Sequence, residues 1–202
     1  PIRPTILEQQ QEMQSVEEKL TLVSTDCGVG IKQNSKGNRE IWIGAKLHIS
    51  AVDGDIPITA FYSGANVHDS SVALPLMQET SKRVNYLYDL QDAGYDADII
   101  REFSTTLGHR PIIDTNPKNS KELKAKIELI EHENKTFKYL NWHLNCDEQH
   151  YKQRSMVERV NKYLKDDFGC DKIYYQGATK VASVLAFGIL SICIHKSLQL
   201  VT

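Results

Sequence analysis

Hydrophobic and polar residues alternate strictly over residues 45–52, AKLHISAV. Ala45, Leu47, Ile49 and Ala51 fall on one side, and Lys46, His48 and Ser50 fall on the other. This period of two predicts a half-buried β-strand. The segment DGDIP then turns the chain, and ITAFY (58–62) returns it. We therefore predict a β-hairpin.

Weaker patterns predict further elements on both sides of this hairpin. Residues 20–31, LTLVSTDCGVGI, indicate a strand that runs into a glycine-containing loop. A helix is expected to start near Asp69, a suitable N-cap residue. Residues 84–90 predict another strand, followed by a turn, a helix that Gly108 closes, and a short strand stopped by Pro117. The strand at residues 84–90, the helix and the short strand form a strand–helix–strand unit.

The order of these elements predicts an α/β fold, a mixed β-sheet with α-helices packed on its faces. At 202 residues the chain is long enough for one sizeable domain, which we place at residues 20–200. Residues 1–19 are interpreted as a lead-in segment, either a helix or a loose stretch, and a Lys/Glu-rich stretch near 118–150 is interpreted as an insertion. The apolar run Val181 to Ile194 is shorter than the ~20 residues of a membrane span, so we predict a buried helix.

Charge and cysteine content narrow the function classes. The net charge of −2 gives no global basic signature for nucleic acid, but residues 115–165 hold eleven Lys and Arg against seven Asp and Glu. A locally basic segment fits a site for phosphate, although a solvated surface gives the same count. Four cysteines without a CxxC motif indicate a reducing cytosol. The chain begins at Pro1 rather than Met, so we expect a fragment of a longer protein or a truncated copy.

Residues 151–165, YKQRSMVERVNKYLK, carry four chemically distinctive side chains. On one continuous α-helix, Tyr151, Arg154, Glu158 and Lys165 would fall at roughly 0°, −60°, −20° and −40°, a narrow stripe. The opposite side is apolar and suited to a core. A purely structural interpretation remains open, in which Arg154 and Glu158 are an ordinary i,i+4 ion pair on a solvated face.

Three acids stand out by position. Asp26 is expected at the end of the first strand, Asp92 just after the fourth, and Glu158 on the helix. Strand ends are where α/β sheets place chemistry. Converging carboxylates could hold divalent cations such as Mg²⁺, which favour oxygen ligands. Taken singly, Asp26 and Asp92 are each better explained as a turn former or a helix cap.

Structural roles explain the other conspicuous residues better than catalysis does. A zinc site at His143, Cys146 and His150 lacks the paired ligands that such sites usually have at both ends. Packing, strand pairing or capping is expected for three more residues, Cys27, His48 and His68.

The chain resembles the DDE transposases of bacterial insertion sequences, whose catalytic domain has an RNase H-like fold. Tyr151, Arg154, Glu158 and Lys165 match the spacing of that family's Y-x2-R-x3-E-x6-K signature, and DAGYDA at 92–97 looks like the motif of the second catalytic Asp. Other segments that look like family segments, in chain order, are WIGAKLHIS, DGDIPITA, ANVHDSSVALPL, GHRPIIDTNP and VASVLAFGIL. The resemblance spans roughly residues 20–200.

The resemblance implies roles for the matched residues. Glu158 would be the third acid and Asp92 the second, with Asp89 as a rival for the second position. Asp26 is our choice for the first acid, although the family often shows Asp-x-Thr or Asp-x-Ser where this chain has STDCGVG. The remaining signature residues would contact DNA, namely Tyr151, Arg154 and Lys165.

The implied activity is metal-dependent DNA cleavage and strand transfer of an insertion element. Two Mg²⁺ or Mn²⁺ ions would be bound by Asp26, Asp92 and Glu158. The implied partners are the element ends and target DNA, with a homodimer assembled on DNA and no membrane. The implied location is the bacterial cytoplasm, at the nucleoid. The alternative is a catalytically inactive remnant that acts as a DNA-binding or structural module.

Overall fold

The computed structural model describes residues 3–33, 37–116 and 150–201, together with a few single positions between 122 and 129. The insertion expected near 118–150 therefore lies almost entirely outside the described residues. The predicted mixed α/β fold is confirmed, as a three-stranded antiparallel sheet, a parallel strand pair and several helices. This arrangement is consistent with an RNase H-like domain.

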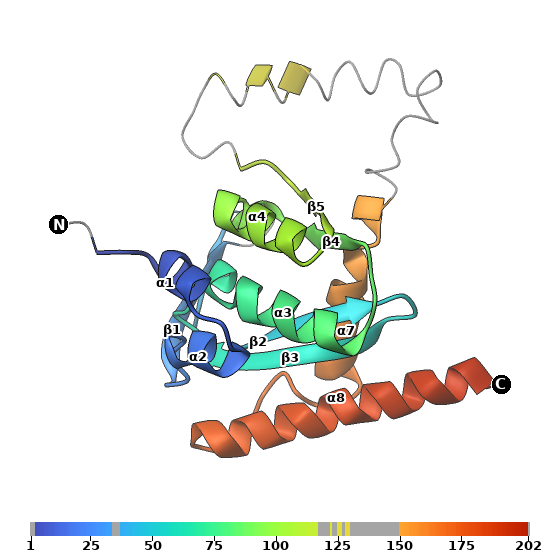
Figure 1. Cartoon of the computed structure of the whole chain (residues 1–202). Coiled ribbons are helices and arrows are strands. Elements are labelled where there is room, and N and C mark those ends of the chain that lie inside the picture. The colour runs from blue at the N-terminus through green and yellow to red at the C-terminus, as the bar shows by residue number, and fades with distance from the viewer. Residues whose placement is uncertain are drawn as a thin grey trace.

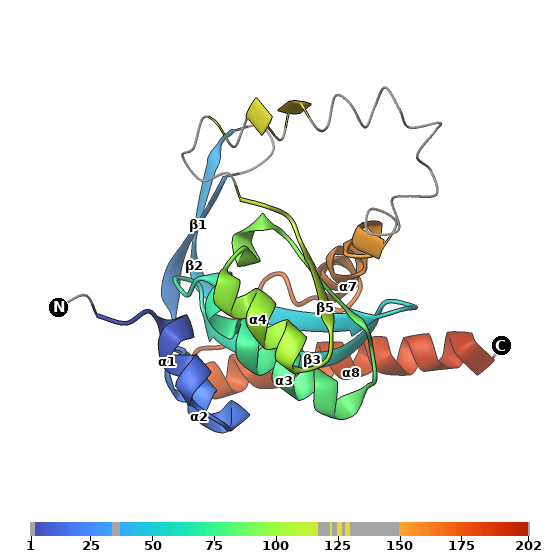
Figure 2. The same ribbon diagram turned by 45° about the horizontal axis from the view of Figure 1, so that its top comes forward.

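The predicted hairpin forms the centre of the molecule. Strand β2 (Arg39–Val52) pairs with β3 (Ile56–Gly64) in antiparallel register, with an irregularity at Ser50/Ala51. Strand β1 (Gly28–Gln33) pairs with the first half of β2. Figure 2 shows β1 and the start of β2 as a two-stranded ribbon that extends from the body of the molecule.

The strand expected within residues 20–31 begins later than predicted. Two short helices come first, α1 (Ile6–Glu12) and α2 (Val16–Thr21), each with a capping box at its N-terminus. Capping boxes satisfy backbone N–H groups that a helix start leaves unpaired. Leu20 and Val23 pack beside Val67 and Val72, so this segment uses a helical rather than a strand spacing. The prediction was therefore wrong: residues 20–27 contain the end of α2 and a loop, and the glycine-containing segment predicted as a loop is the strand β1.

The strand–helix–strand unit is present. After a 3₁₀ turn at Asp69–Val72 comes α3 (Ala73–Arg83), then β4 (Tyr88–Gln91), α4 (Asp98–Thr106) and β5 (Arg110–Ile113). Strands β4 and β5 pair in parallel, and β4 is shorter than predicted. The helix α4 ends as expected at Gly108, whose φ of +83° favours glycine. His68, not Asp69, caps the 3₁₀ turn.

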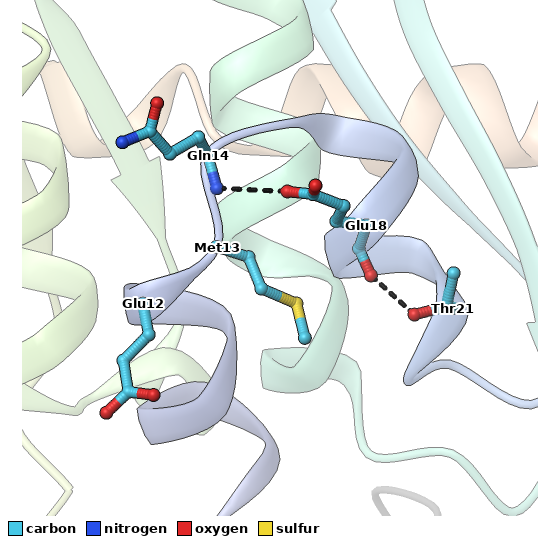
Figure 3. A pocket seen from close by; sticks show the side chains of 5 residues that line it. All are labelled: Glu12, Met13, Gln14, Glu18 and Thr21. Atoms are coloured by element: carbon cyan, nitrogen blue, oxygen red, sulfur yellow. Dashed lines mark hydrogen bonds between the residues drawn. The ribbon is translucent and has the colours of Figure 1, made fainter.

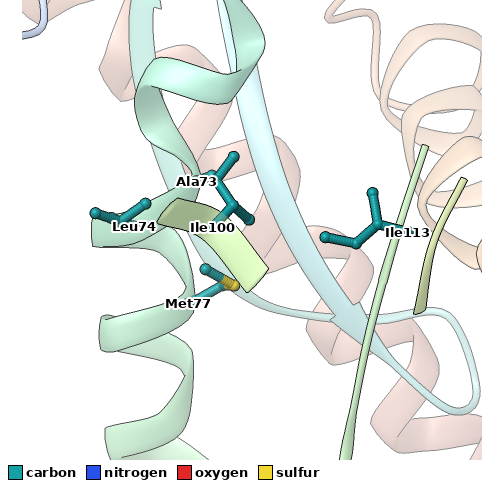
Figure 4. Packing of buried hydrophobic residues seen from close by; sticks show 5 residues of the cluster. All are labelled: Ala73, Leu74, Met77, Ile100 and Ile113. Atoms are coloured by element: carbon teal, nitrogen blue, oxygen red, sulfur yellow. The ribbon is translucent and has the colours of Figure 1, made fainter. Parts of the chain in front are cut away.

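Helices cover both faces of the β2–β3 hairpin (Figure 1). On one face, α7 (Ser155–Asp166) and α8 (Ala178–Val201) bury Val160, Leu164 and Ile192 against Ile49. On the other face lies α3, which packs on α4 and β5 around a second cluster shown in Figure 4, composed of Ala73, Leu74, Met77, Ile100 and Ile113.

The C-terminal helix is not buried as predicted. Only part of α8 faces the sheet, through Leu185 and Ile192, whereas Phe187 and Leu190 are more than half exposed. Within the described part of the chain, one helical stretch, Ala178–Gln199, is long and apolar enough to cross a membrane by length and composition alone. A single helix of this kind is weak evidence for a membrane span.

Candidate active site

Two aspartates lie side by side at the carboxyl end of the parallel strand pair. Asp92 follows β4 and Asp114 follows β5, directly after the paired residues Gln91 and Ile113. The Asp114 backbone N–H donates to the Gln91 carbonyl at 3.4 Å. Asp92 is exposed, and its side chain accepts from the backbone N–H of Gly94 at 3.0 Å. Asp114 was not predicted from the sequence, although its position after a strand matches that of Asp92.

Tyr151 reaches this strand end from the start of the α7 region. Its hydroxyl donates a hydrogen bond to Asp114 Oδ2. Burial, the bond to Asp114 and the nearby negative charges of Asp114 and Asp92 raise the pKa of Tyr151 to about 12. The phenol is therefore protonated at neutral pH and acts as a hydrogen-bond donor.

Arg154 links Tyr151 to Glu158. The Arg154 guanidinium lies 5.5 Å from the centroid of the Tyr151 ring, and its Nη2 is 3.1 Å from Glu158 Oε1. The single continuous helix predicted over residues 151–165 was wrong, because the chain turns at Gln153 and Arg154 before α7 begins at Ser155. A turn and side-chain contacts thus bring Tyr151, Arg154 and Glu158 near one another. Lys165 lies about two helical turns beyond Glu158 on α7.

Lys165 and Glu158 remain open to solvent on α7. Lys165 is exposed in the last turn of the helix, and the Glu158 side chain is 63% exposed. Val160 and Leu164 on the apolar side of α7 are buried, as the sequence predicted. A cation near the helix C-terminus is also favoured by the helix dipole.

Asp26 lies apart from this chain of contacts, in an exposed loop before β1 rather than at the end of a strand. The loop runs beside the end of β3, where the Gly64 N–H donates to the Ser24 carbonyl at 2.9 Å. A Cβ at position 64 would lie 2.3 Å from the Asp26 carbonyl oxygen, so the close approach requires glycine there. Burial, Cys27 and Asp26 together raise the pKa of Tyr62.

Asp89 is engaged elsewhere. It is 6% exposed, and its Oδ2 accepts from Ser104 Oγ at 2.6 Å and lies 3.1 Å from His109 Nδ1. The Tyr86 ring contacts His109 in a tilted arrangement, and its hydroxyl hydrogen-bonds the Asp89 carboxylate, which adds to burial in raising the pKa of Tyr86. These contacts tie β4 to α4 and β5, and they leave Asp92 as the exposed acid at the strand end.

The three proposed acids have the donor chemistry that Mg²⁺ prefers, because all of them offer carboxylate oxygens. Among the residues that the structure describes, however, no three His, Cys, Asp or Glu side chains lie close enough together to hold a metal ion. Asp92 is held by Gly94 and Glu158 by Arg154.

Three histidines in the described ranges, His48, His68 and His150, have structural contacts. His48 Nε2 lies 2.8 Å from Ser63 Oγ across the hairpin, and burial lowers the pKa of His48. His68 caps the 3₁₀ turn, and the ring of His150 stacks on Tyr88. Cys27 is an exposed free thiol, so the packing predicted for it was wrong. The other two residues of the rejected zinc site, His143 and Cys146, lie outside the described residues.

A shallow hollow between α1 and α2 lies outside this acidic region. Figure 3 shows its five lining residues, Glu12, Met13, Gln14, Glu18 and Thr21. The hydrogen bonds drawn there are local: the Gln14 N–H donates to the Glu18 carboxylate at 3.2 Å, and Thr21 Oγ1 donates to the Glu18 carbonyl at 2.6 Å. These contacts stabilise the two ends of α2 and bring no further chemistry to the hollow.

Comparison with known proteins identifies a family for most of the chain. A family model described as the transposase DDE domain matches residues 17–194. No curated protein and no solved structure gives a significant match.

Proposed function

The chain belongs to the DDE transposase family, and on this premise we propose that it cleaves DNA and transfers the cut strand to another DNA. The observation that carries the proposal is the chain of contacts at the parallel strand end. There Asp114, Tyr151, Arg154 and Glu158 connect in sequence, with Asp92 beside them. The proposed substrates are the ends of an insertion element and target DNA, with two copies of the protein acting together.

We propose Asp26, Asp92 and Glu158 as the catalytic acids. Their support is the family membership, the exposure of all three side chains and the carboxylate chemistry. Divalent ions, Mg²⁺ or Mn²⁺, held by such carboxylates would stabilise charge on the attacking and leaving oxygens of a phosphodiester. Asp26 must approach the other two for this assignment to hold.

Tyr151, Arg154 and Lys165 are proposed to bind DNA phosphates next to these acids. Arg suits bidentate phosphate contacts, and the Lys ammonium acts as a point charge. Arg154 already pairs with Glu158 and therefore also orients that acid in the absence of DNA. Cytoplasmic location at the nucleoid follows as part of the same proposal.

The deciding experiment replaces Glu158 with Gln, which keeps the size of the side chain and removes its charge. We expect Glu158→Gln to lose DNA cleavage and joining by at least ~100-fold while DNA affinity is kept, because electrostatic stabilisation of the transition state is a large part of catalysis. The assay uses the full-length protein, element-end DNA and Mg²⁺ or Mn²⁺. Glu102→Gln, an exposed glutamate on α4, is the matched control.

Two outcomes would count against the proposal. If Glu158→Gln cleaves and joins DNA as fast as the parent protein, Glu158 is not a catalytic acid. If the parent binds DNA and metal but never cuts, the chain is an inactive remnant that retains the fold.

A further inference from the structure

We propose that Asp114 is a positioning residue that, through Tyr151, docks the start of the α7 region onto the end of the parallel strand pair and so sets Glu158 relative to Asp92. The inference rests on the proposed function, because it takes Asp92 and Glu158 as catalytic acids. It adds a residue outside the family signature to the machinery of the site.

The two acids belong to different packing units of the molecule. Asp92 follows β4, which pairs with β5 and packs with α4. Glu158 lies on α7, whose buried side chains Val160 and Leu164 pack on the β2–β3 hairpin and α8. An ion pair between Arg159 and Asp55, 2.7 Å apart, fixes α7 to the hairpin turn as well. None of these contacts ties α7 to the parallel strands.

The chain itself does not fix that relationship either. Strand β5 ends at Ile113 and α7 begins at Ser155, so the connection between them is long. Helix α3 packs on the hairpin and on the α4–β5 unit, and so joins the two units. Contacts near residue 150 connect the start of the α7 region directly to the parallel strands.

Two contacts attach the segment near residue 150 to the strand pair, one at each end of the pair. The His150 ring stacks on Tyr88 at the start of β4, with centroids 4.2 Å apart. The Tyr151 hydroxyl donates to Asp114 directly after β5. Successive residues of one short segment are thus attached to the β4–β5 pair, and Asp114 supplies a charged acceptor to the Tyr151 hydroxyl.

The turn after Tyr151 connects the docked segment to Glu158. The Arg154 N–H donates to the Tyr151 carbonyl at 3.0 Å, which fixes the turn, and the Arg154 side chain contacts both the Tyr151 ring and Glu158. Asp114 can therefore affect Glu158 without touching DNA. A different role, as an additional metal ligand beside Asp92, would require the charge of Asp114 and not its hydrogen bond.

Replacement by Asn separates these roles, because the Asn side-chain oxygen still accepts a hydrogen bond from Tyr151 but carries no charge. The experiment compares Asp114→Ala, Asp114→Asn, Tyr151→Phe and the double variant Asp114→Ala/Tyr151→Phe in the full-length protein. Asp53→Ala, an exposed aspartate in the hairpin turn, is the control. The measurements are the DNA cleavage rate at saturating DNA and the hydrogen exchange of amides 150–158.

We expect Asp114→Ala and Tyr151→Phe each to slow cleavage by about tenfold, and the double variant to be no slower than the slower single one, because contacting residues act as a unit. Asp114→Asn should stay within about twofold of the parent, as its hydrogen bond is retained. Amides 150–158 should exchange faster in the Ala and Phe variants and not in the Asn variant. The Asp53→Ala control should behave as the parent does.

Three results would overturn the positioning role. The first is exchange of amides 150–158 that does not change in Asp114→Ala. The second is a double variant whose defect is the product of the two single defects. The third is an Asp114→Asn variant as impaired as Asp114→Ala that needs more metal, which would make Asp114 a ligand. If the parent itself does not cleave DNA, the proposed function fails, while hydrogen exchange still tests the docking.

Discussion

Two aspartates three residues apart, Asp89 and Asp92, have opposite environments. Asp89 is buried and accepts hydrogen bonds from Ser104 and the neighbouring His109 and Tyr86, whereas Asp92 is exposed. A buried carboxylate with several donors stabilises the packing around it, and its loss leaves those donors unsatisfied. An exposed carboxylate at a strand end is available to a ligand. The difference in burial therefore assigns the two residues to stability and to the candidate site, respectively.

This assignment predicts opposite effects of the same substitution. Asp89→Asn should lower the free energy of unfolding by about 2 kcal/mol, because a neutral amide replaces a charged acceptor in a buried network. Asp92→Asn should change it by about 0.5 kcal/mol or less and should instead remove DNA cleavage. Urea unfolding and the cleavage assay measure the two effects. If the Asp92→Asn protein cleaves DNA normally, Asp92 is not the second catalytic acid.

At the scale of elements, α8 is the helix that departs most from its expected environment. Its sequence is apolar almost throughout, but the helix rests on the sheet by one side only. Ile192 is 1% exposed and packs with Ile49, Val160 and Leu164, whereas Ile194 is 54% exposed. Ile192 and Ile194 therefore allow the buried and the exposed side of α8 to be tested with the same substitution.

We expect Ile192→Ala to lower the free energy of unfolding by about 3 kcal/mol, because it leaves a cavity in the core. Ile194→Ala is the matched control and should change it by about 0.5 kcal/mol or less. Denaturant unfolding of both variants measures the difference. Equal destabilisation by the two substitutions would mean that the exposed side of α8 is covered in solution.

At the scale of the whole molecule, Asp55 connects three elements. It lies in the turn of the hairpin, pairs with Arg159 of α7 at 2.7 Å and approaches Lys196 of α8 at 3.7 Å. The hydrogen bond from Arg159 and the two positive charges hold the pKa of Asp55 below its ordinary value, against the opposing effect of burial. Folding thus favours the ionised form of this carboxyl.

This linkage gives the protein a predictable response to acid. A carboxyl whose pKa is lowered by folding stabilises the protein fully above its unfolded-state pKa of about 3.9, and this contribution is lost as the pH falls through the lower folded-state value. Asp55→Asn should therefore lower stability at neutral pH and flatten its decline below about pH 4.

Thermal unfolding between pH 7 and pH 2.5 measures this dependence, with Asp53→Asn as the exposed control two residues away. Glu8, Glu18 and Glu79 also have lowered pKa values, mainly from hydrogen bonds, so some acid sensitivity should remain in the Asp55→Asn variant. If the stability of the Asp55→Asn variant declines at acid pH as steeply as that of the parent, the ion pairs of Asp55 contribute little in solution.

The sequence by itself determined the features that depend on neighbouring residues. Strict alternation over residues 45–52 specified the hairpin, because successive side chains of a strand point to opposite faces. Spaced motifs identified Asp92 and Glu158 and the family, and the apolar side of α7 was evident from helical spacing. The assignment of Asp26, Asp92 and Glu158 as catalytic acids remains a prediction.

Only the tertiary structure decided which residues meet across long separations. Asp89 and Asp92 are alike in sequence, and burial against α4 distinguishes them. Asp114 and Tyr151 carry no local signal of their hydrogen bond, because parallel strand pairing and the docking of a distant segment create it. The loop position of Asp26 and the exposed side of α8 likewise depend on which surfaces the rest of the chain covers. Such contacts are set by the packing of the whole chain, which no window of sequence contains.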